Sequence, residues 1–495
     1  MSRITYTVLM TVAIYCLAAA TAMAQAKFVE FPIANGSDTT FAISGAYDGA
    51  NYLVGIQGDL LAHYNITAQL VSSSGSLIGS RISVGRTGGA PYVAFDGTNY
   101  LMVWGDDANY PNSDVYGQFI NTSGNLVGAA FPIVASSNGE DCDGMAFGDT
   151  AYLVTFSIDD ALYGQRLSKA GNLIGGAIQI SSNAVRHSAI AFDGTNFLVV
   201  WQCGWTPNYD VQGRFVSESG STTDIFTINE TPSSSHNPLS IAFDGANYLV
   251  AWNKDIGPGY PSPTIWDIYA RKVSPSGTMG SPEFPITIEP DDQLHPSIAF
   301  DGANYLITWN SQTSLDTMYT RGRFFDTTGV PLDTAFTIFS PAGSKVSFYG
   351  RHIYGGTQFF AFTNKTMIDT TGGGFSFGDV DIYGTFIPKY TGVAGNPADP
   401  VNVSSFKIGQ NSPNPFNQST MINYQLTKPG LVNLAVYNTA GQLVKTLVNA
   451  WRQPGSYSVS WDCTGNDSHK VANGVYLARL ESQGRAVTTK MVVVR

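Results

Sequence analysis

Four pairs of closely spaced aspartates are the side chains of this sequence best suited to bind a cation or to act in acid–base catalysis. The pairs are Asp106 with Asp107, Asp141 with Asp143, Asp159 with Asp160, and Asp291 with Asp292. Paired carboxylates can supply the several oxygen ligands that calcium takes, and they can act together in glycoside hydrolysis. Aspartate is also a common turn residue, because its side chain hydrogen-bonds its own backbone. Three interpretations therefore stay open: a calcium site at Asp106, Asp107, Asp291 and Asp292, a catalytic pair, or solvated turns.

Aromatic residues crowd the same segments of the chain. They are Tyr110, Trp205, Tyr209, Tyr260 and Trp266. Rings exposed in loops would suit stacking on sugars or anchoring a protein partner, whereas rings packed within the loops would have a structural role only. We expect the exposed arrangement, in which Trp205 and Trp266 are binding anchors outside the core.

Two histidines share one position relative to the internal repeat described below. His187 and His295 stand five residues before Phe192 and Phe300, and Cys142 and Pro238 occupy the same position in other copies. A metal site would need ligands from several copies within about 2 Å of one ion. We therefore expect these histidines to lie near a bound ligand, with no metal assigned to them.

The sequence contains none of several familiar catalytic motifs, so its catalytic residues stay unknown. The sequence has no phosphate-binding loop, no His-Glu-x-x-His, no Gly-x-Ser-x-Gly and no calcium-hand spacing. These absences remove the sharper catalytic templates.

An internal repeat positions all of these residues. Strong copies lie at Ala94–Trp104, Ala191–Trp201, Ala242–Trp252 and Ala299–Trp309, and weaker copies lie at Ala46–Gln57, Ala146–Phe156 and Ile353–Phe362. Each copy has a short apolar strand, a turn rich in Asp and Gly, and a second strand that is apolar at every position, as a strand buried on both faces is. Four antiparallel strands per repeat of roughly 50 residues are typical of a β-propeller blade. The pattern predicts an all-β chain with seven blades.

The two ends of the array predict that the ring closes. A fourth strand follows each of the first six copies, but the seventh ends at its third strand. Phe31-Pro32-Ile33 matches Phe131-Pro132-Ile133 and Phe284-Pro285-Ile286 residue for residue. We expect this N-terminal segment to complete the last blade, so that the propeller spans 27–390.

Length, charge and cysteine content limit the partners, the export route and the disulfide bonds that this chain can have. The chain has 495 residues and a formal charge of −11, which disfavours a nucleic-acid partner. Arg3, the apolar run Val8–Ala20 and Ala22-Met23-Ala24 predict a signal peptide at 1–24, and no later stretch is apolar enough to span a membrane. The mature chain keeps Cys142, Cys203 and Cys463, and the first two either pair or, as we expect, stay free.

A different domain follows a linker at 391–405. Short alternating strands are expected at Met421–Leu426, Leu431–Tyr437, Gln442–Leu447, Ser456–Trp461 and Val475–Leu480. About ninety residues of such strands predict an immunoglobulin-like β-sandwich over 406–495.

The last ninety residues resemble a known family, the C-terminal sorting domains of type IX secretion and the similar immunoglobulin-like domain of flagellar hook-capping proteins. The motif residues are Pro413, Asn414, Pro415, Phe416, Gly441 and Lys490, together with Gly455-Ser456-Tyr457 and Gly474-Val475-Tyr476. Cys463 departs from the family, where glycine follows Trp-Asp. The resemblance implies export by the secretion machinery of a Gram-negative bacterium, followed by removal of the domain or attachment at the surface. The repeats themselves resemble arrays of secreted bacterial proteins, which implies the fold and an extracellular setting.

These observations predict a secreted or surface-attached β-propeller that binds an extracellular polysaccharide or protein. Two alternatives stay open: a polysaccharide-degrading enzyme, and a structural component of the cell surface. Calcium is the one cofactor that the acidic pairs suggest. Fold resemblance alone does not choose among these functions.

Overall fold

The computed structural model describes most of the chain. The described residues are 28–35, 40–58, 64–110, 112–182, 185–205, 208–231, 239–256, 266–287, 289, 291–314, 317–340, 345–369, 376–390, 406–408, 411, 413–426, 430–438, 442–452, 455–466, 469–482 and 485–494. Two compact units divide it, Met1–Gly392 and Val393–Arg495. Every named element in them is a β-strand, and no helix of the described residues is long and apolar enough to cross a membrane.

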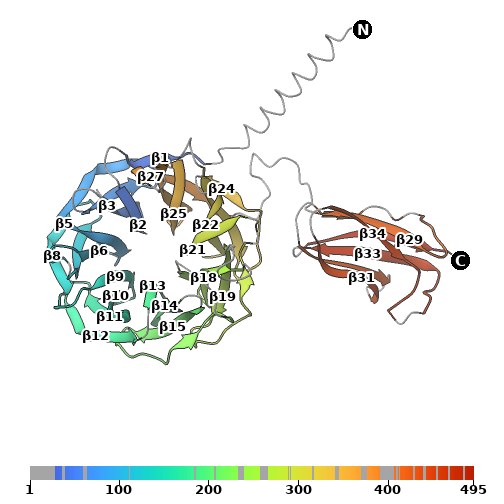
Figure 1. The fold of residues 1–495 in the computed structure, drawn as a ribbon, viewed down its shortest axis with the longest axis horizontal. Coiled ribbons are helices and arrows are strands. Elements are labelled where there is room, and N and C mark those ends of the chain that lie inside the picture. Colours follow the sequence, from blue (N-terminus) through green and yellow to red (C-terminus); the bar gives the residue numbers. More distant parts are fainter. Residues whose placement is uncertain are drawn as a thin grey trace, which may run out of the picture. The chain divides into compact units, whose positions relative to one another are not determined.

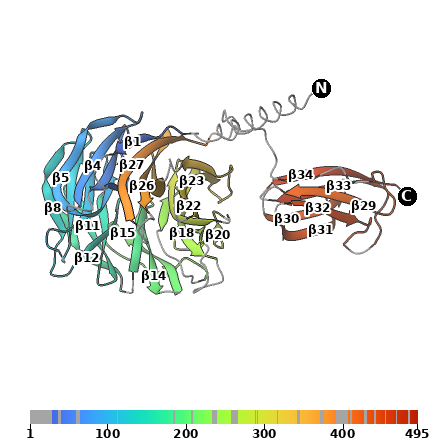
Figure 2. The ribbon, with the colours of Figure 1, turned by 45° about the horizontal axis from the view of Figure 1, so that its top comes forward.

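The first unit is a β-propeller, in which antiparallel sheets stand side by side around a ring (Figures 1 and 2). Five of its sheets have four strands, and one has seven because the long strand β5 belongs to two groups. In order from the inner strand outward, the groups are β2 (Thr40–Tyr47), β3 (Asn51–Gly58), β4 (Asn65–Ser72) and the first part of β5 (Leu77–Phe95); the second part of β5, β6 (Asn99–Asp106), β7 (Asp114–Asn121) and β8 (Leu126–Val134); β9 (Asp141–Phe147), β10 (Ala151–Ile158), β11 (Ala161–Ser168) and β12 (Leu173–Ser181); β13 (Val185–Phe192), β14 (Asn196–Trp205), β15 (Asn208–Ser217) and β16 (Phe226–Thr227); β17 (Ser240–Phe243), β18 (Tyr248–Asp255), β19 (Trp266–Val273) and β20 (Phe284–Pro285); β21 (Asp292–Phe300), β22 (Asn304–Ser314), β23 (Thr317–Asp326) and β24 (Phe336–Phe339); and β25 (Lys345–Tyr354), β26 (Gln358–Asp369), β27 (Ser376–Pro388) and β1 (Phe31–Ala34).

The repeated turn between the two inner strands is built by its aspartate. In the second group, Asp96 Oδ1 accepts hydrogen bonds from the backbone N–H groups of Thr98 at 2.7 Å and Asn99 at 2.8 Å. Gly97 supplies the positive φ of 89° that this turn needs. The same pair of bonds recurs at Asp48, Asp193, Asp244 and Asp301.

The N-terminal strand lies at the outer edge of the last group. β1 pairs with β27, and Phe31 stands opposite Gly384. Phe131 stands opposite Gly117 in the second group, which is the same register. The two ends of the array therefore share one sheet.

Neighbouring sheets pack through the fully apolar second strands. Tyr100, which is completely buried, donates from its hydroxyl to the backbone carbonyl of Asn51 in the preceding group at 3.0 Å. Burial and the neighbouring Asp48 carboxylate raise the pKa of Tyr100. The equivalent tyrosines Tyr152, Tyr248 and Tyr305 have raised pKa values from burial and from the turn aspartate of the preceding group.

Two turns have glycine in place of this aspartate, Gly148 and Gly355, and the first of them is completed from the next sheet. The third group has Gly148 in place of the aspartate, and Glu218, which follows β15, takes over its role. Glu218 Oε1 accepts from the backbone N–H groups of Thr150 at 2.8 Å and Ala151 at 3.2 Å. A Cβ at Gly148 would lie 2.4 Å from Glu218 Oε1 and 2.9 Å from Phe197 Cζ. The carboxylate that the third group lacks at Gly148 is thus supplied by Glu218 of the next sheet.

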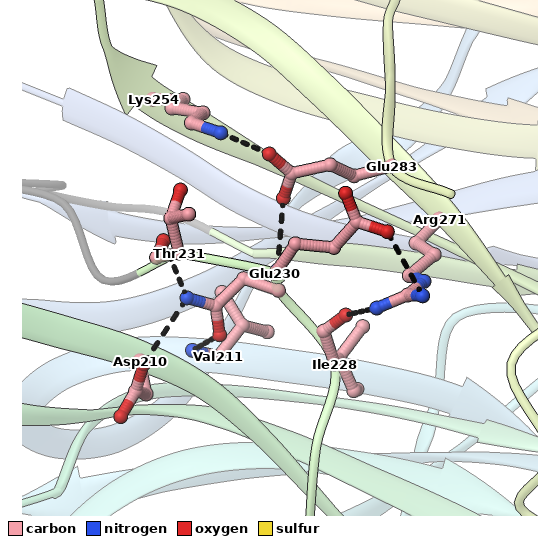
Figure 3. Close-up of polar contacts among 9 residues, drawn as sticks. Asp210, Val211, Ile228, Glu230, Thr231, Lys254, Arg271 and Glu283 are labelled. Carbon is pink, nitrogen blue, oxygen red and sulfur yellow. Dashed lines mark hydrogen bonds and ion pairs between the residues drawn. The ribbon is translucent and has the colours of Figure 1, made fainter.

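An ion-pair network joins the fourth and fifth groups, whose outer strands β16 and β20 have only two residues each. Glu283 contacts Lys254 and accepts from the backbone N–H of Glu230 at 3.1 Å, while Arg271 contacts the Glu230 carboxylate at 3.2 Å (Figure 3). Asn229 Oδ1 accepts from the Val211 N–H at 2.7 Å, which extends the short strand by a side chain (Figure 3). These contacts stabilise a region that has few strand hydrogen bonds.

The second unit is a β-sandwich. One sheet contains β28 (Phe406–Ile408), β29 (Thr420–Leu426) and β32 (Gly455–Trp461), and the other contains β31 (Leu443–Arg452), β30 (Gly430–Asn438), β33 (Gly474–Ser482) and β34 (Arg485–Val493). Its core includes Phe416, Trp461 and Tyr476, whose rings meet edge to face at 5.7 and 5.3 Å between centroids. Cys463 is fully buried in this core and has a φ of +57°, which agrees with a position where the family has glycine.

Candidate ligand-binding cavity

The inner strands of the propeller are interrupted at one shared position. Their ladders skip Ile43 in β2, Asp143 in β9 and His187 in β13, and they skip two residues each in β5, β21 and β25. Such bulges bend a strand and redirect its side chains, and they are common beside functional sites. The position that His187 and His295 share in the sequence is therefore the position of the bulge.

A cavity of about 280 Å³ lies where these bulges meet. It is lined by residues of β2, β5, β9, β13, β17, β21 and β25, with one residue from β26. Several of its polar side chains are engaged in joining sheets: Ser44 Oγ accepts from the Val93 N–H at 3.1 Å, and Ser240 Oγ accepts from the Ile298 N–H at 2.9 Å. Ser188 and Thr155 share a hydrogen bond of 3.0 Å.

Asp143 is the one carboxyl group among the described residues that line the cavity. Its Oδ2 atom is buried and has no hydrogen-bond partner among the described residues. Burial raises the pKa of Asp143 to about 7, the hydrogen bond from Ser157 opposes this shift, and Asp141 adds to it. A buried acceptor without a partner is costly, so Asp143 Oδ2 can accept or donate a hydrogen bond to a molecule in the cavity.

Tyr92 and Arg351 face the same cavity from β5 and β25. Burial raises the pKa of Tyr92, with further contributions from Cys142 and Asp143, while Arg351 lowers it. Tyr92 therefore lies within electrostatic reach of both Asp143 and Arg351. An acid, a phenol and a guanidinium together offer donors and acceptors to a polar ligand.

His352 lines the cavity but is bound within the protein. Its Nε2 donates to the Leu306 carbonyl at 2.9 Å, and its Nδ1 accepts from the Thr308 hydroxyl at 3.1 Å in the matching neutral tautomer. Burial lowers the pKa of His352 to about 4. This side chain is therefore neutral near pH 7, and its role is to hold neighbouring sheets together.

The expected aromatic platform is only partly present. Tyr110 is 82% exposed, but Tyr209 is 6% exposed and Trp266 is 9% exposed. The expectation of exposed rings is wrong for Tyr209 and Trp266, because they lie in β15 and at the start of β19 and pack in the core. Tyr260 and the side chain of Trp205 lie outside the described residues.

The histidines hold different positions. His295 lies in the bulge of β21 with a φ of +57°, and its backbone N–H donates to Asn253 Oδ1 of the neighbouring sheet at 3.1 Å. It does not line the cavity described here. The backbone of His187 lies in the bulge of β13, and its side chain is outside the described residues.

The acidic pairs serve mainly the fold. Asp106 is fully buried and held by Arg86, with Nε to Oδ2 at 2.6 Å and Nη2 to Oδ1 at 2.9 Å, so its carboxylate already has a cationic partner within the fold. Asp292 Oδ1 accepts from the Trp266 N–H at 3.1 Å. Asp107 is partly buried, and its burial and the charge of Asp106 raise its pKa. The backbone carbonyl of Asp291 accepts a hydrogen bond from the Gln293 side chain. No group of three or more His, Cys, Asp or Glu side chains within the described ranges is placed to hold a metal.

Two further expectations can be compared with the structure. Asp159 and Asp160 both have positive φ, 48° and 64°, in the two-residue turn between β10 and β11, which is the turn interpretation. Cys142, Cys203 and Cys463 are free thiols.

The sequence motif of the second unit ties its two ends together. Asn414 Oδ1 accepts from the Val492 N–H at 2.8 Å, and Asn414 Nδ2 donates to the Lys490 carbonyl at 3.3 Å. Phe416 is buried, and its N–H donates to the Val492 carbonyl at 3.0 Å. Pro413 and Pro415 are exposed beside it, and Gly441 lies outside the described residues.

Sequence reasoning missed Tyr92 and Arg351, and it considered Asp143 only as part of a pair. The available signal was the repeat itself. Counted back from the turn anchors, Tyr92 and Arg351 occupy a position that is Ser, Gly or Ala in the other copies, and Asp143 precedes that position in its own copy.

Comparison with known proteins bears on both units. The family model described as the FlgD Ig-like domain matches residues 412–485, and no curated protein matches the chain. Among solved structures, the Dos1 propeller is similar at 10% identity and a TM-score of 0.44, over 72% of this chain and 93% of that chain. The polysaccharide lyase Uly1 is similar at 9% identity and a TM-score of 0.44, over 68% and 88%. The hemagglutinin-neuraminidase of Parainfluenza Virus 5 is similar at 8% identity and a TM-score of 0.41, over 72% and 92%. The chain thus combines a β-propeller with a segment that matches the FlgD Ig-like domain.

Proposed function

We propose that this chain is an exported β-propeller that binds an extracellular ligand, a polysaccharide or a protein, in its central cavity. The observation that carries the proposal is Asp143, whose Oδ2 is buried without a partner where the inner strands meet. Burying a polar atom without a hydrogen bond costs stability. A concave site with a few polar groups is typical of ligand binding.

The proposal includes a closed ring of seven blades. Three facts support it: the inner strands of all seven groups line one cavity, β5 serves two groups, and β1 shares a sheet with the last strands of the array. A closed ring holds these inner strands rigidly, which keeps the polar groups of the cavity in place without a ligand.

Binding without hydrolysis is the expected activity. The described lining contains one carboxyl group, whereas most glycoside hydrolases need two carboxyl groups that flank the bond. Tyr110 remains the exposed ring best placed for stacking on a longer sugar chain.

The test is a glycan array of the purified chain, run beside an assay of reducing-sugar release. We expect binding to a defined set of glycans and no release of reducing ends. Release of sugar would favour the enzyme alternative. Failure to bind any glycan or secreted protein would leave a structural surface component as the better account.

The second unit supports a proposed route of export. Its resemblance to type IX sorting domains rests on Pro413–Phe416 and the residues around Lys490, and the FlgD Ig-like model matches over 412–485. Asn414 and Phe416 bind the backbone of β34, so the motif ties the beginning of the domain to its last strand. We propose that this unit directs the propeller to the outside of a Gram-negative cell.

A further inference from the structure

We propose that the central cavity binds a sugar unit that carries a carboxylate, with the carboxylate at Arg351 and hydroxyl groups at Asp143 and Tyr92. The inference rests on the proposed function and names the chemical class of its ligand. Four observations lead to it.

The first observation is the charge of the lining. Arg351 is the one lysine or arginine among the described residues that line the cavity. A guanidinium binds a carboxylate through two parallel hydrogen bonds and does not lose its charge. A ligand with an anionic group therefore matches the permanent charge of this cavity better than a cationic one.

The second observation is the placement of the polar groups. Tyr92, Asp143 and Arg351 all line this one cavity, from β5, β9 and β25. The serine hydroxyls of β2, β13 and β17 are engaged between sheets. A ligand with several hydroxyl groups beside its carboxylate can satisfy the Asp143 carboxyl and the Tyr92 hydroxyl together.

The third observation is the apolar remainder of the lining. Ala189 and Met145 come from β13 and β9, Ile241 comes from β17, and Leu239 directly precedes β17. A pyranose ring has hydroxyl groups at its edge and C–H groups on its faces. The lining combines these apolar side chains with the polar groups of Tyr92, Asp143 and Arg351, which matches such a ring.

The fourth observation is size. The cavity volume of about 280 Å³ lies near the lower end of the range for small-molecule sites. This volume suits one sugar unit of a chain rather than a long stretch of it.

The test is calorimetric titration of the full chain with glucuronate and with glucose at pH 6. We expect glucuronate to bind at least tenfold more tightly than glucose. Arg351→Gln should remove this preference, and Arg351→Lys, which keeps the charge but not the two parallel bonds, should be intermediate. Arg479→Gln is the matched control, because Arg479 is an exposed arginine of the second unit and its loss should leave both affinities unchanged.

The pH dependence supplies a second readout that a structural role would not move. The groups that act on Asp143 are Tyr92 on β5, Asp141 and Cys142 on its own strand, and Ser157 on β10. Because the pKa of Asp143 is about 7, raising the pH from 6 to 8 adds a negative charge beside the bound carboxylate. Glucuronate affinity should fall by up to about tenfold over this range, and Asp143→Asn should abolish the fall.

Three results would overturn the inference. Equal affinity for glucose and glucuronate, with glycan binding on the array retained, would refute the acidic ligand and leave the proposed function standing. Affinity that rises with pH would indicate a cationic group at Asp143. Binding of neither sugar by a chain that still binds glycans on the array would place the ligand outside this cavity.

Discussion

Replacing Asp143 with asparagine should make the propeller more stable at pH 8. The carboxyl group has an ordinary pKa of 3.8 and a pKa of about 7 in the folded chain, because burial disfavours its charge. The folded state therefore holds a proton that the unfolded state has lost between pH 4 and 7, and stability falls as the pH rises through this window. The full shift corresponds to at most about 4 kcal/mol, and since Asp143 is only half-buried, we expect a gain of about 1–3 kcal/mol.

The measurement is urea unfolding of the wild-type chain and Asp143→Asn, followed by tryptophan fluorescence, at pH 4 and pH 8. The gain should appear at pH 8 and be absent at pH 4, where both side chains are neutral. Asp224→Asn, at an exposed aspartate that does not line the cavity, is the control and should show neither effect. If Asp143→Asn lost stability equally at both pH values, Asp143 would be a structural hydrogen-bonding residue and the argument for a ligand site would fail.

Three further predictions concern the sheets, the core and the second unit. Glu218→Ala should destabilise the propeller by about 0.5–1.5 kcal/mol, since the exposed N–H of Thr150 and the partly buried N–H of Ala151 lose their acceptor, and adding Gly148→Asp should restore part of the loss in a double-mutant cycle; if the two effects simply add, Glu218 does not stand in for the turn aspartate. Lowering the pH from 7 to 5 should destabilise the chain through His352 by at most about 2 kcal/mol, because the unfolded chain takes up a proton below the ordinary pKa of 6.5 while the folded chain stays neutral until the pH nears 4; His352→Gln should remove this step, and an unchanged pH profile would contradict it. Deleting 406–495 should leave a folded propeller in the periplasm, and normal appearance of the truncated chain in the medium would contradict the sorting role.

The repeat made the strands and their order predictable. The Asp-Gly turns, the apolar second strands and the Phe-Pro-Ile motif at Phe31 each report a local rule of turn chemistry or burial. β1 lies beside β27 as that motif suggests. In the second unit, β28 and β34 were missed because they are the short first strand and the strand closest to the chain end.

The candidate site was much less predictable, because it depends on where strands are interrupted. Sequence periodicity does not show a bulge, yet the bulge at Asp143 decides that its carboxyl group lines the cavity. The sequence around a loop does not show burial either. Trp266 follows a segment of loop-type residues, but it is buried at the start of β19. Arg86 contacts Asp106 from β5, the strand that pairs with β6. The sequence pair Asp106 and Asp107 did not reveal that one of its carboxylates already has a cationic partner.

The most direct test of the central claim is a crystal structure of the full chain soaked with glucuronate. The account predicts density for one sugar unit in the central cavity, with its carboxylate at Arg351 and its hydroxyl groups at Tyr92 and Asp143. Density beside Tyr110 with the central cavity empty would contradict it.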